Sequence, residues 1–389
     1  MVMRPSTRRK MGLRLGIDRL LGSEYKKLEG KRLGLITNET GQTSNLVPTI
    51  DALCEHPRLN LVALFGPEHG VRGYAQAGAR VSSSTDPGTD LPVHSLYGKS
   101  VKPTPEMLSE VDAIIFDIQD AGVRFFTYMS TLAHVMQAAV GTDIDIVVLD
   151  RPNPITGTRV EGTVLDPNFA SFVGLYPIAL RHGMTVGEMA HMFNEAFGIG
   201  CKLSVVRMEG WNRSSWYDET GAFWVLPGPN VATLDSAILY PGTCLVEGVN
   251  VSEGRGTTRA FENIGAPWID ARELWRSLRA LDLAGVAFRQ AYFIPTFSKY
   301  QGELCAGVQL HVTDRDTFQP VNTGLHLIAT LKSLYPELLE FRPHFDRLLG
   351  TDTVRKQLEA GHSVESIVAS WAPELERFCQ LRDKYLLYD

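Results

Sequence analysis

The first half of the chain alternates between short β-branched apolar runs and segments long enough to form helices. The apolar runs are Arg32–Thr37, Leu61–Phe65, Ala113–Phe116, Asp145–Leu149 and Leu203–Val206. Continuous apolar runs of this length are typical of strands buried on both faces, and intervening helices favour parallel pairing. We therefore predict an α/β fold built on a parallel sheet.

One of the intervening helices is marked clearly. Met184–Phe197 carries apolar residues at helical spacing, Thr185 is in position to cap it, and Glu188 follows three residues later. Gly198 is expected to end it.

The residues that follow the predicted strands are mostly polar. In an open parallel sheet, ligands bind beyond the carboxyl ends of the strands. Turn formation and helix capping would also favour these residue types, but the same chemistry recurs at four strand ends. The four segments are Asn38-Glu39-Thr40, Gly66-Pro67-Glu68-His69-Gly70, Asp117-Ile118-Gln119-Asp120 and Asp150-Arg151-Pro152-Asn153-Pro154.

A run of turn-forming residues, Pro227-Gly228-Pro229-Asn230, predicts a domain boundary. We expect one domain over residues 1–226 and a second, smaller one over 227–389. Within the second, Glu247–Thr258 combines glycines with acids and an arginine, so we expect it to line a cleft shared by both domains. Gly307–Val312 resembles a strand, and Gly324–Leu334 and Val354–Leu358 resemble amphipathic helices.

Charge and cysteine content exclude several classes of protein. Lys and Arg total 38 against 44 Asp and Glu, a net charge of -6, which argues against a nucleic-acid binder. The five scattered cysteines argue against a disulfide framework and favour reduced thiols in the cytoplasm. Arg14, Asp18 and Arg19 interrupt what would be the apolar part of an export signal, and we predict no membrane span.

Signatures of nucleotide hydrolysis, dinucleotide binding, serine-elbow esterases and zinc proteases are absent from the sequence. What remains is a set of carboxylates at strand ends or in glycine-flanked loops, and carboxylate pairs carry out glycoside hydrolysis. A divalent cation held by Asp117 and Asp120 is a weaker alternative, so we predict neither metal nor cofactor. The carboxylates are Glu68, Asp117, Asp120, Asp150, Glu161, Glu247 and Glu253.

Arginines and aromatic residues accompany these acids. Guanidinium groups suit an anionic ligand, although arginines beside acids often form internal ion pairs instead. Aromatic rings could stack on a sugar, although such rings more often belong to a core. The residues concerned are Arg72, Arg124, Arg151 and Arg255, with Tyr74, Tyr128 and Trp211.

Several motifs, taken together, resemble the exo-β-N-acetylmuramidase family, long catalogued as a domain of unknown function. The likeness runs in order from about Gly16 to the C-terminus. It rests on Gly66–Gly70, Phe116–Arg124, Tyr128, Asp150–Pro154, Tyr240-Pro241-Gly242 and Ser252–Thr258.

The resemblance implies a Rossmann-like N-terminal domain, a smaller α/β C-terminal domain and an active site between them. It also implies removal of N-acetylmuramic acid from the non-reducing end of peptidoglycan fragments, with Glu68 as the catalytic acid. For the second carboxylate, Glu161 ranks slightly ahead of Asp120 and Glu253.

The remaining site residues receive supporting roles under this interpretation. Arg72, Arg124, Arg151 or Arg255 would bind the lactyl carboxylate of the sugar, while His69 and Asn153 would orient their neighbours. Asp117, Tyr128, Asp150 and Glu253 complete the predicted substrate-binding set. A cytoplasmic member would act on imported wall fragments.

Two other functions stay open on the sequence alone. One is a non-catalytic protein that closes its two domains around an amino sugar or muropeptide. The other is a metal-dependent phosphoesterase centred on Asp117 and Asp120.

Overall fold

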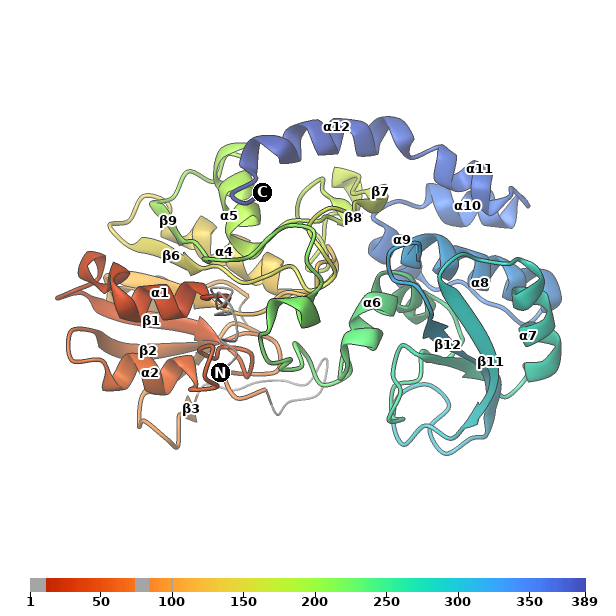
Figure 1. Cartoon of the computed structure of the whole chain (residues 1–389), viewed down its shortest axis with the longest axis horizontal. Coiled ribbons are helices and arrows are strands. Elements are labelled where there is room, and N and C mark those ends of the chain that lie inside the picture. The colour runs from red at the N-terminus through yellow and green to blue at the C-terminus, as the bar shows by residue number, and fades with distance from the viewer. Residues whose placement is uncertain (1–11, 74–83, 99–100) are drawn as a thin grey trace, which may run out of the picture.

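The structure is a computed structural model and describes residues 12–73, 84–98 and 101–389. Two α/β domains lie side by side, with the N-terminal domain in red to green and the C-terminal domain in green to blue (Figure 1). The larger sheet has seven strands in the order β3-β4-β2-β1-β5-β6-β9, and all neighbours pair in parallel except β3 and β4. The strands are β1 (Arg32–Thr37), β2 (Asn60–Gly66), β3 (Ser84–Thr85), β4 (Pro92–Ser95), β5 (Ala113–Asp117), β6 (Asp145–Leu149) and β9 (Leu203–Val206).

The central strands are buried on both faces, as the sequence predicts. Successive side chains of β5 divide between two cores: Ala113 and Ile115 face one, and Ile114 and Phe116 face the other. Helices α1 and α2 cover the first face, and α4 and α5 cover the second. The predicted α/β class and all five predicted strands are confirmed.

The helices of the N-terminal domain begin where their sequences cap them. In α5 the Thr185 hydroxyl accepts from the Glu188 backbone N–H, while the Glu188 carboxylate accepts from the Thr185 N–H, so both groups of the predicted capping box are present. Gly198 follows with a positive φ of 72°. The helices are α1 (Gly16–Gly22), α2 (Thr49–Glu55), α3 (Pro105–Ser109), α4 (Tyr128–Ala139) and α5 (Val186–Glu195).

The C-terminal domain is built on a smaller antiparallel sheet. Its strands lie in the order β10 (Asn263–Ala266), β12 (Cys305–Val312) and β11 (Val286–Phe293). A separate pair, β7 (Glu161–Val164) and β8 (Ala179–Arg181), belongs to the N-terminal half of the chain. The remaining helices are α6 (Leu234–Thr243), α7 (Ala271–Ala280), α8 (Pro320–Leu334), α9 (Pro343–Leu349), α10 (Thr353–Glu359), α11 (Val364–Ala369) and α12 (Ala372–Arg382).

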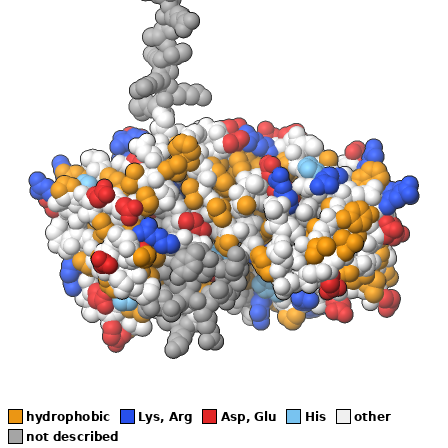
Figure 2. Space-filling model, turned by 90° about the horizontal axis from the view of Figure 1, so that it is seen from below, with side chains coloured by type: hydrophobic (Ala, Val, Ile, Leu, Met, Phe, Trp, Pro, Cys, Tyr) orange, Lys and Arg blue, Asp and Glu red, His pale blue; other side chains and the backbone are white. Residues whose placement is uncertain are grey.

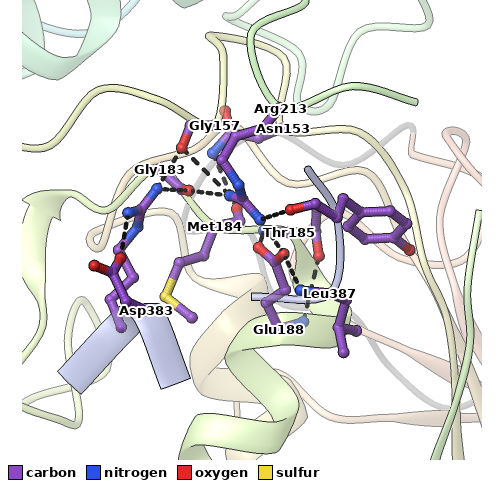
Figure 3. Close-up of polar contacts among 12 residues, drawn as sticks. Asn153, Gly157, Gly183, Met184, Thr185, Glu188, Arg213, Asp383 and Leu387 are labelled. Atoms are coloured by element: carbon purple, nitrogen blue, oxygen red, sulfur yellow. Dashed lines mark hydrogen bonds and ion pairs between the residues drawn. The ribbon is translucent and has the colours of Figure 1, made fainter. Parts of the chain in front are cut away.

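Helix α12 carries the chain back from the C-terminal domain to the N-terminal one (Figure 1). Its last residues join a buried network in which Glu188 forms an ion pair with Arg213 and accepts from the Leu387 backbone N–H at 2.8 Å (Figure 3). Arg382 donates to the Gly183 carbonyl at 2.9 Å, and the Tyr388 hydroxyl donates to Asp150 at 2.6 Å. The C-terminus is therefore fastened to the domain in which the chain began.

The face of the molecule seen from below bears no dominant sign of charge (Figure 2). Seen from below, acidic and basic side chains are scattered over both domains (Figure 2). Within the described part of the chain, no helix combines the length and apolar character needed to cross a membrane.

The domain division at residue 227 stays a prediction. The chain leaves the large sheet at β9, and Gly228–Val231 forms part of the boundary between the two halves before α6 begins at Leu234.

Candidate active site

A cavity of about 380 Å³ lies between the two domains. Both domains supply its walls, because the loop after β2 and the start of α4 face α6, α9 and the loop before α6. The described lining residues are Glu68, His69, Tyr97, Phe125, Phe126, Thr127, Tyr128, Phe172, Val173, Gly228, Pro229, Asn230, Val231, Tyr240, Cys244, Glu247, Arg255, Phe261, His344 and Leu348.

Glu68 is brought to the cavity by a tight turn at the carboxyl end of β2. The Gly70 backbone N–H donates to the Pro67 carbonyl at 2.9 Å, which closes the turn. His69 and Gly70 both adopt positive φ, 74° and 77°, and His69 is a residue type that rarely does so. Strained backbone of this kind is common at functional sites, and here it turns Glu68 and His69 into the same cavity.

Two hydroxyl groups hold the Glu68 carboxyl. Thr127, just before α4, donates to Glu68 Oε2 at 2.8 Å. Tyr97 hydrogen-bonds to the same side chain. Burial raises the pKa of Tyr97 to about 12, with the Glu68 carboxylate adding to the effect, so the phenol keeps its proton and can donate it. The carboxyl group is thus oriented from two sides.

An aromatic cluster forms the apolar part of the cavity. Phe126 meets Tyr128 and Tyr240 edge-to-face, with ring centroids 5.1 and 5.9 Å apart, and Tyr240 meets Phe261 at 4.6 Å. The Tyr128 hydroxyl donates to the Pro227 carbonyl at 2.9 Å and accepts from Asn38 at 2.8 Å. These contacts fix the rings and join the apolar wall to the loop between the domains.

The C-terminal domain contributes a charged wall. Arg255 forms ion pairs with Glu247 at 2.6 Å and with Glu253 at 3.2 Å, and its guanidinium lies over the Phe261 ring. Burial would raise the pKa of Glu247, but its hydrogen bond with His344 and its pairing with Arg255 lower that pKa to about 2. Glu247 is therefore ionised at neutral pH.

The structure brings four of the predicted site residues to this cavity. Glu68, His69, Tyr128 and Arg255 all line it; the first two come from a strand-end segment picked out in the sequence, and the last two from motifs that carry the family resemblance. The glycine-rich segment of the second domain reaches the same cavity through Glu247 and Arg255.

The other three predicted arginines are committed elsewhere. Arg72 makes a bidentate ion pair with Asp86 at 2.8 and 2.9 Å, and Arg151 makes one with Asp117 at 2.6 and 2.9 Å. Arg124 is fully buried and donates to three backbone carbonyls, and burial lowers its pKa to about 9. These arginines hold loops together and are not among the described lining residues.

The polar residues of the other strand ends are likewise structural. Asp117 accepts from Arg151 with both oxygens, and Asp120 accepts from the Gly122 N–H at 2.6 Å. Asp150 caps α5 and contacts Tyr388, while Asn153 donates to the Met184 carbonyl at 3.0 Å. None of these four is among the described lining residues of the cavity.

The structure also separates the candidates for the second carboxylate. Glu161 lies on β7 and forms an ion pair with Arg181, away from the described cavity lining. Glu253 lies behind Arg255, in a second cavity that adjoins the first. Trp211 packs edge-to-face on Tyr388, and Tyr74 lies outside the described residues.

Several lining residues were not predicted as site residues. Tyr97, Thr127, Asn230 and His344 carry no motif, and they reach the cavity from four separate segments. Glu247 begins the segment Glu247–Thr258, which the sequence predicts to line a shared cleft, but it is not among the predicted site residues. Its glycine-rich surroundings were the one sequence signal available for this wall.

Comparison with known proteins assigns the chain to a family. Residues 33–235 match the model for the N-terminal domain of the exo-β-N-acetylmuramidase NamZ, and residues 238–388 match the model for its C-terminal domain. The chain belongs to this family. It is 53% identical to the peptidoglycan β-N-acetylmuramidase NamZ of Bacillus subtilis (strain 168) over 98% of its length and 93% of that protein.

Two solved structures share the fold of the family. Both are DUF1343 family proteins of Bacteroides fragilis NCTC 9343, 38% and 33% identical to this chain, with TM-scores of 0.90 and 0.79. In each case 97% of this chain and 99% of the other are covered. The predicted family, two-domain α/β architecture and enzyme class, a glycoside hydrolase, are thereby confirmed.

Proposed function

We propose that this exo-β-N-acetylmuramidase family member removes N-acetylmuramic acid from the non-reducing end of peptidoglycan fragments, with Glu68 as the general acid. The observation that carries the proposal is the placing of Glu68 in the interdomain cavity, held by Thr127 and hydrogen-bonded to Tyr97. A general acid must keep a fixed position, and the two hydrogen bonds hold the Glu68 carboxyl in the cavity.

The proposed reaction is the cleavage of one glycosidic C–O bond by water. Glu68 gives its proton to the glycosidic oxygen as the bond breaks, and positive charge develops on the sugar ring. Water then bonds to the ring carbon that carried the leaving oxygen and gives a proton to the Glu68 carboxylate, which restores the acid. On the C-terminal wall, Glu247 is held as an anion by Arg255 and His344. We assign it the stabilisation of that positive charge, because a carboxylate with so low a pKa is a poor proton acceptor.

The volume of the cavity supports an exo mode of attack. Small-molecule sites span about 300–1,000 Å³, and the 380 Å³ here suits a single sugar unit better than a long glycan chain. Phe126 and Tyr240 offer the ring faces and edges on which a pyranose packs.

The test is product release from a defined disaccharide, N-acetylmuramic acid linked to N-acetylglucosamine. The proposal expects free N-acetylmuramic acid and N-acetylglucosamine to appear in equal amounts and to increase with time. A non-catalytic binding protein would instead give saturable binding with no release, and that result would overturn the proposal.

We further propose that the enzyme acts in the cytoplasm on imported wall fragments. All five cysteines are unpaired in the structure, and three of them are buried, which fits a reducing compartment. Fractionation of the producing cells should recover the muramidase activity with a cytoplasmic marker enzyme. Recovery in the culture fluid or with the cell wall would contradict this location.

A further inference from the structure

A second cavity, of about 450 Å³, continues the first into the C-terminal domain. The two cavities share Glu247, Arg255 and His344 as lining residues, so they adjoin at these three side chains. The rest of the second cavity is formed by Glu253, Phe297, Ser298, Lys299 and Arg342.

Most charges in this second cavity are already used by the fold. Arg255 is paired with Glu247 and Glu253. The Lys299 ammonium donates to the carbonyls of Val246, Val249 and Val251 at 2.8–2.9 Å and pairs with Glu253 at 3.1 Å. These contacts fix the loop that carries Glu247 and leave little capacity for a ligand.

Arg342 differs from the other cations. Its backbone N–H donates to the Gly248 carbonyl at 2.8 Å, which fixes its position just before α9. No described residue forms a hydrogen bond or an ion pair with its guanidinium, although the side chain lines the cavity. The backbone of Arg342 is therefore held in place, while the N–H donors of its guanidinium remain available for a ligand.

The charge balance of the second cavity favours an anion. Arg255, Lys299 and Arg342 carry three positive charges against the two carboxylates of Glu247 and Glu253, and His344 adds a further donor. A guanidinium binds a carboxylate by two parallel hydrogen bonds, which a neutral sugar hydroxyl cannot match. The charges and donors of the second cavity therefore suit a carboxylate.

We propose that Arg342 and this second cavity form a subsite for a carboxylate of the substrate. This proposal rests on the muramidase function proposed above. The sequence suggests this role for Arg72, Arg124, Arg151 or Arg255, but all four make contacts within the protein, so Arg342 takes the role instead. The carboxylate belongs either to the lactyl group of the sugar being released or to a muramyl or peptide group beyond the cleaved bond.

The experiment compares wild type with Arg342→Gln on a chromogenic N-acetylmuramide and on the same compound with its lactyl carboxyl converted to an amide. The control is Arg347→Gln, which removes an exposed arginine of α9 outside the described lining of both cavities. A second substrate pair is a muropeptide fragment whose carboxylates beyond the cleaved bond are free or amidated.

If the lactyl group is the ligand, Arg342→Gln lowers kcat/KM for the chromogenic muramide about tenfold or more, mainly through KM. The amide is then hydrolysed equally by both proteins. If the carboxylate lies beyond the cleaved bond, the loss appears only with the free muropeptide fragment. Equal behaviour of Arg342→Gln and wild type on every substrate would overturn the proposal, whereas a wild type without muramidase activity would overturn the function itself.

Discussion

The buried ion pair between Glu188 and Arg213 lies in the N-terminal domain, where Glu188 also binds the C-terminal segment of the chain (Figure 3). Glu188 is fully buried, and its carboxylate also accepts from the backbone N–H groups of Thr185 at 2.9 Å and Leu387 at 2.8 Å. Glu188→Gln preserves the size of the side chain but removes the charge that compensates Arg213. We therefore expect a large loss of stability.

The magnitude follows from the burial of the pair. Leaving one partner of a buried ion pair uncompensated costs about 3–5 kcal/mol. For a domain of this size, each kcal/mol lowers Tm by about 2–4 °C, so the expected fall is about 6–20 °C. Arg213 also lies near Arg382, and that second cation makes the loss of the carboxylate more costly.

The measurement is thermal unfolding by calorimetry at neutral pH. The matched control is Glu195→Gln on the same helix, where the side chain is 61% exposed and pairs only with His191, so its Tm should stay within about 2 °C of wild type. A Tm for Glu188→Gln within that same range would refute the reasoning.

Two further changes test other parts of the structure. Burial raises the pKa of Asp150 to about 6, although its hydrogen bonds act in the opposite direction. Between pH 3.8, its ordinary pKa in the unfolded chain, and pH 6, the folded protein therefore keeps a proton on Asp150 that the unfolded chain has lost. This carboxyl should therefore reduce the free energy of unfolding by about 2 kcal/mol as pH rises from 4 to 7. Urea unfolding of Asp150→Asn at both pH values should show the variant gaining on wild type at the higher pH, and a constant difference would exclude the effect. Tyr97→Phe removes one hydrogen bond to Glu68, worth about 1.5–3 kcal/mol, so kcat on a chromogenic muramide should fall about tenfold to a hundredfold. Full activity would mean that Tyr97 does not orient the acid.

The sequence predicts the sheet well because burial on both faces leaves a direct mark on composition. β1, β2, β5 and β6 are buried almost throughout and apolar at most positions. β9 is less buried but still mostly apolar. β3 is exposed and β4 has a single buried residue, so these two short strands carry no comparable pattern. The capped start of α5 is equally local, since Thr185 and Glu188 lie three residues apart.

The site is harder to predict because it depends on long-range partners. The sequence suggests that Arg124 binds a ligand. In the structure it donates instead to the Leu348 carbonyl, 224 residues further along the chain. Glu247 and His344 also lie far apart in the sequence and carry no shared motif. Glu68 was accessible to sequence reasoning because the flanking glycines and the strand end lie within five residues of one another.

The most direct test of the central claim is the turnover of a chromogenic N-acetylmuramide by Glu68→Gln. The substitution preserves the size of the side chain and its contact with Thr127 while removing the transferable proton. We predict that turnover falls by at least a hundredfold at unchanged Tm, whereas Glu376→Gln on the exposed face of α12 keeps wild-type turnover. Undiminished turnover by a folded Glu68→Gln protein would contradict the account.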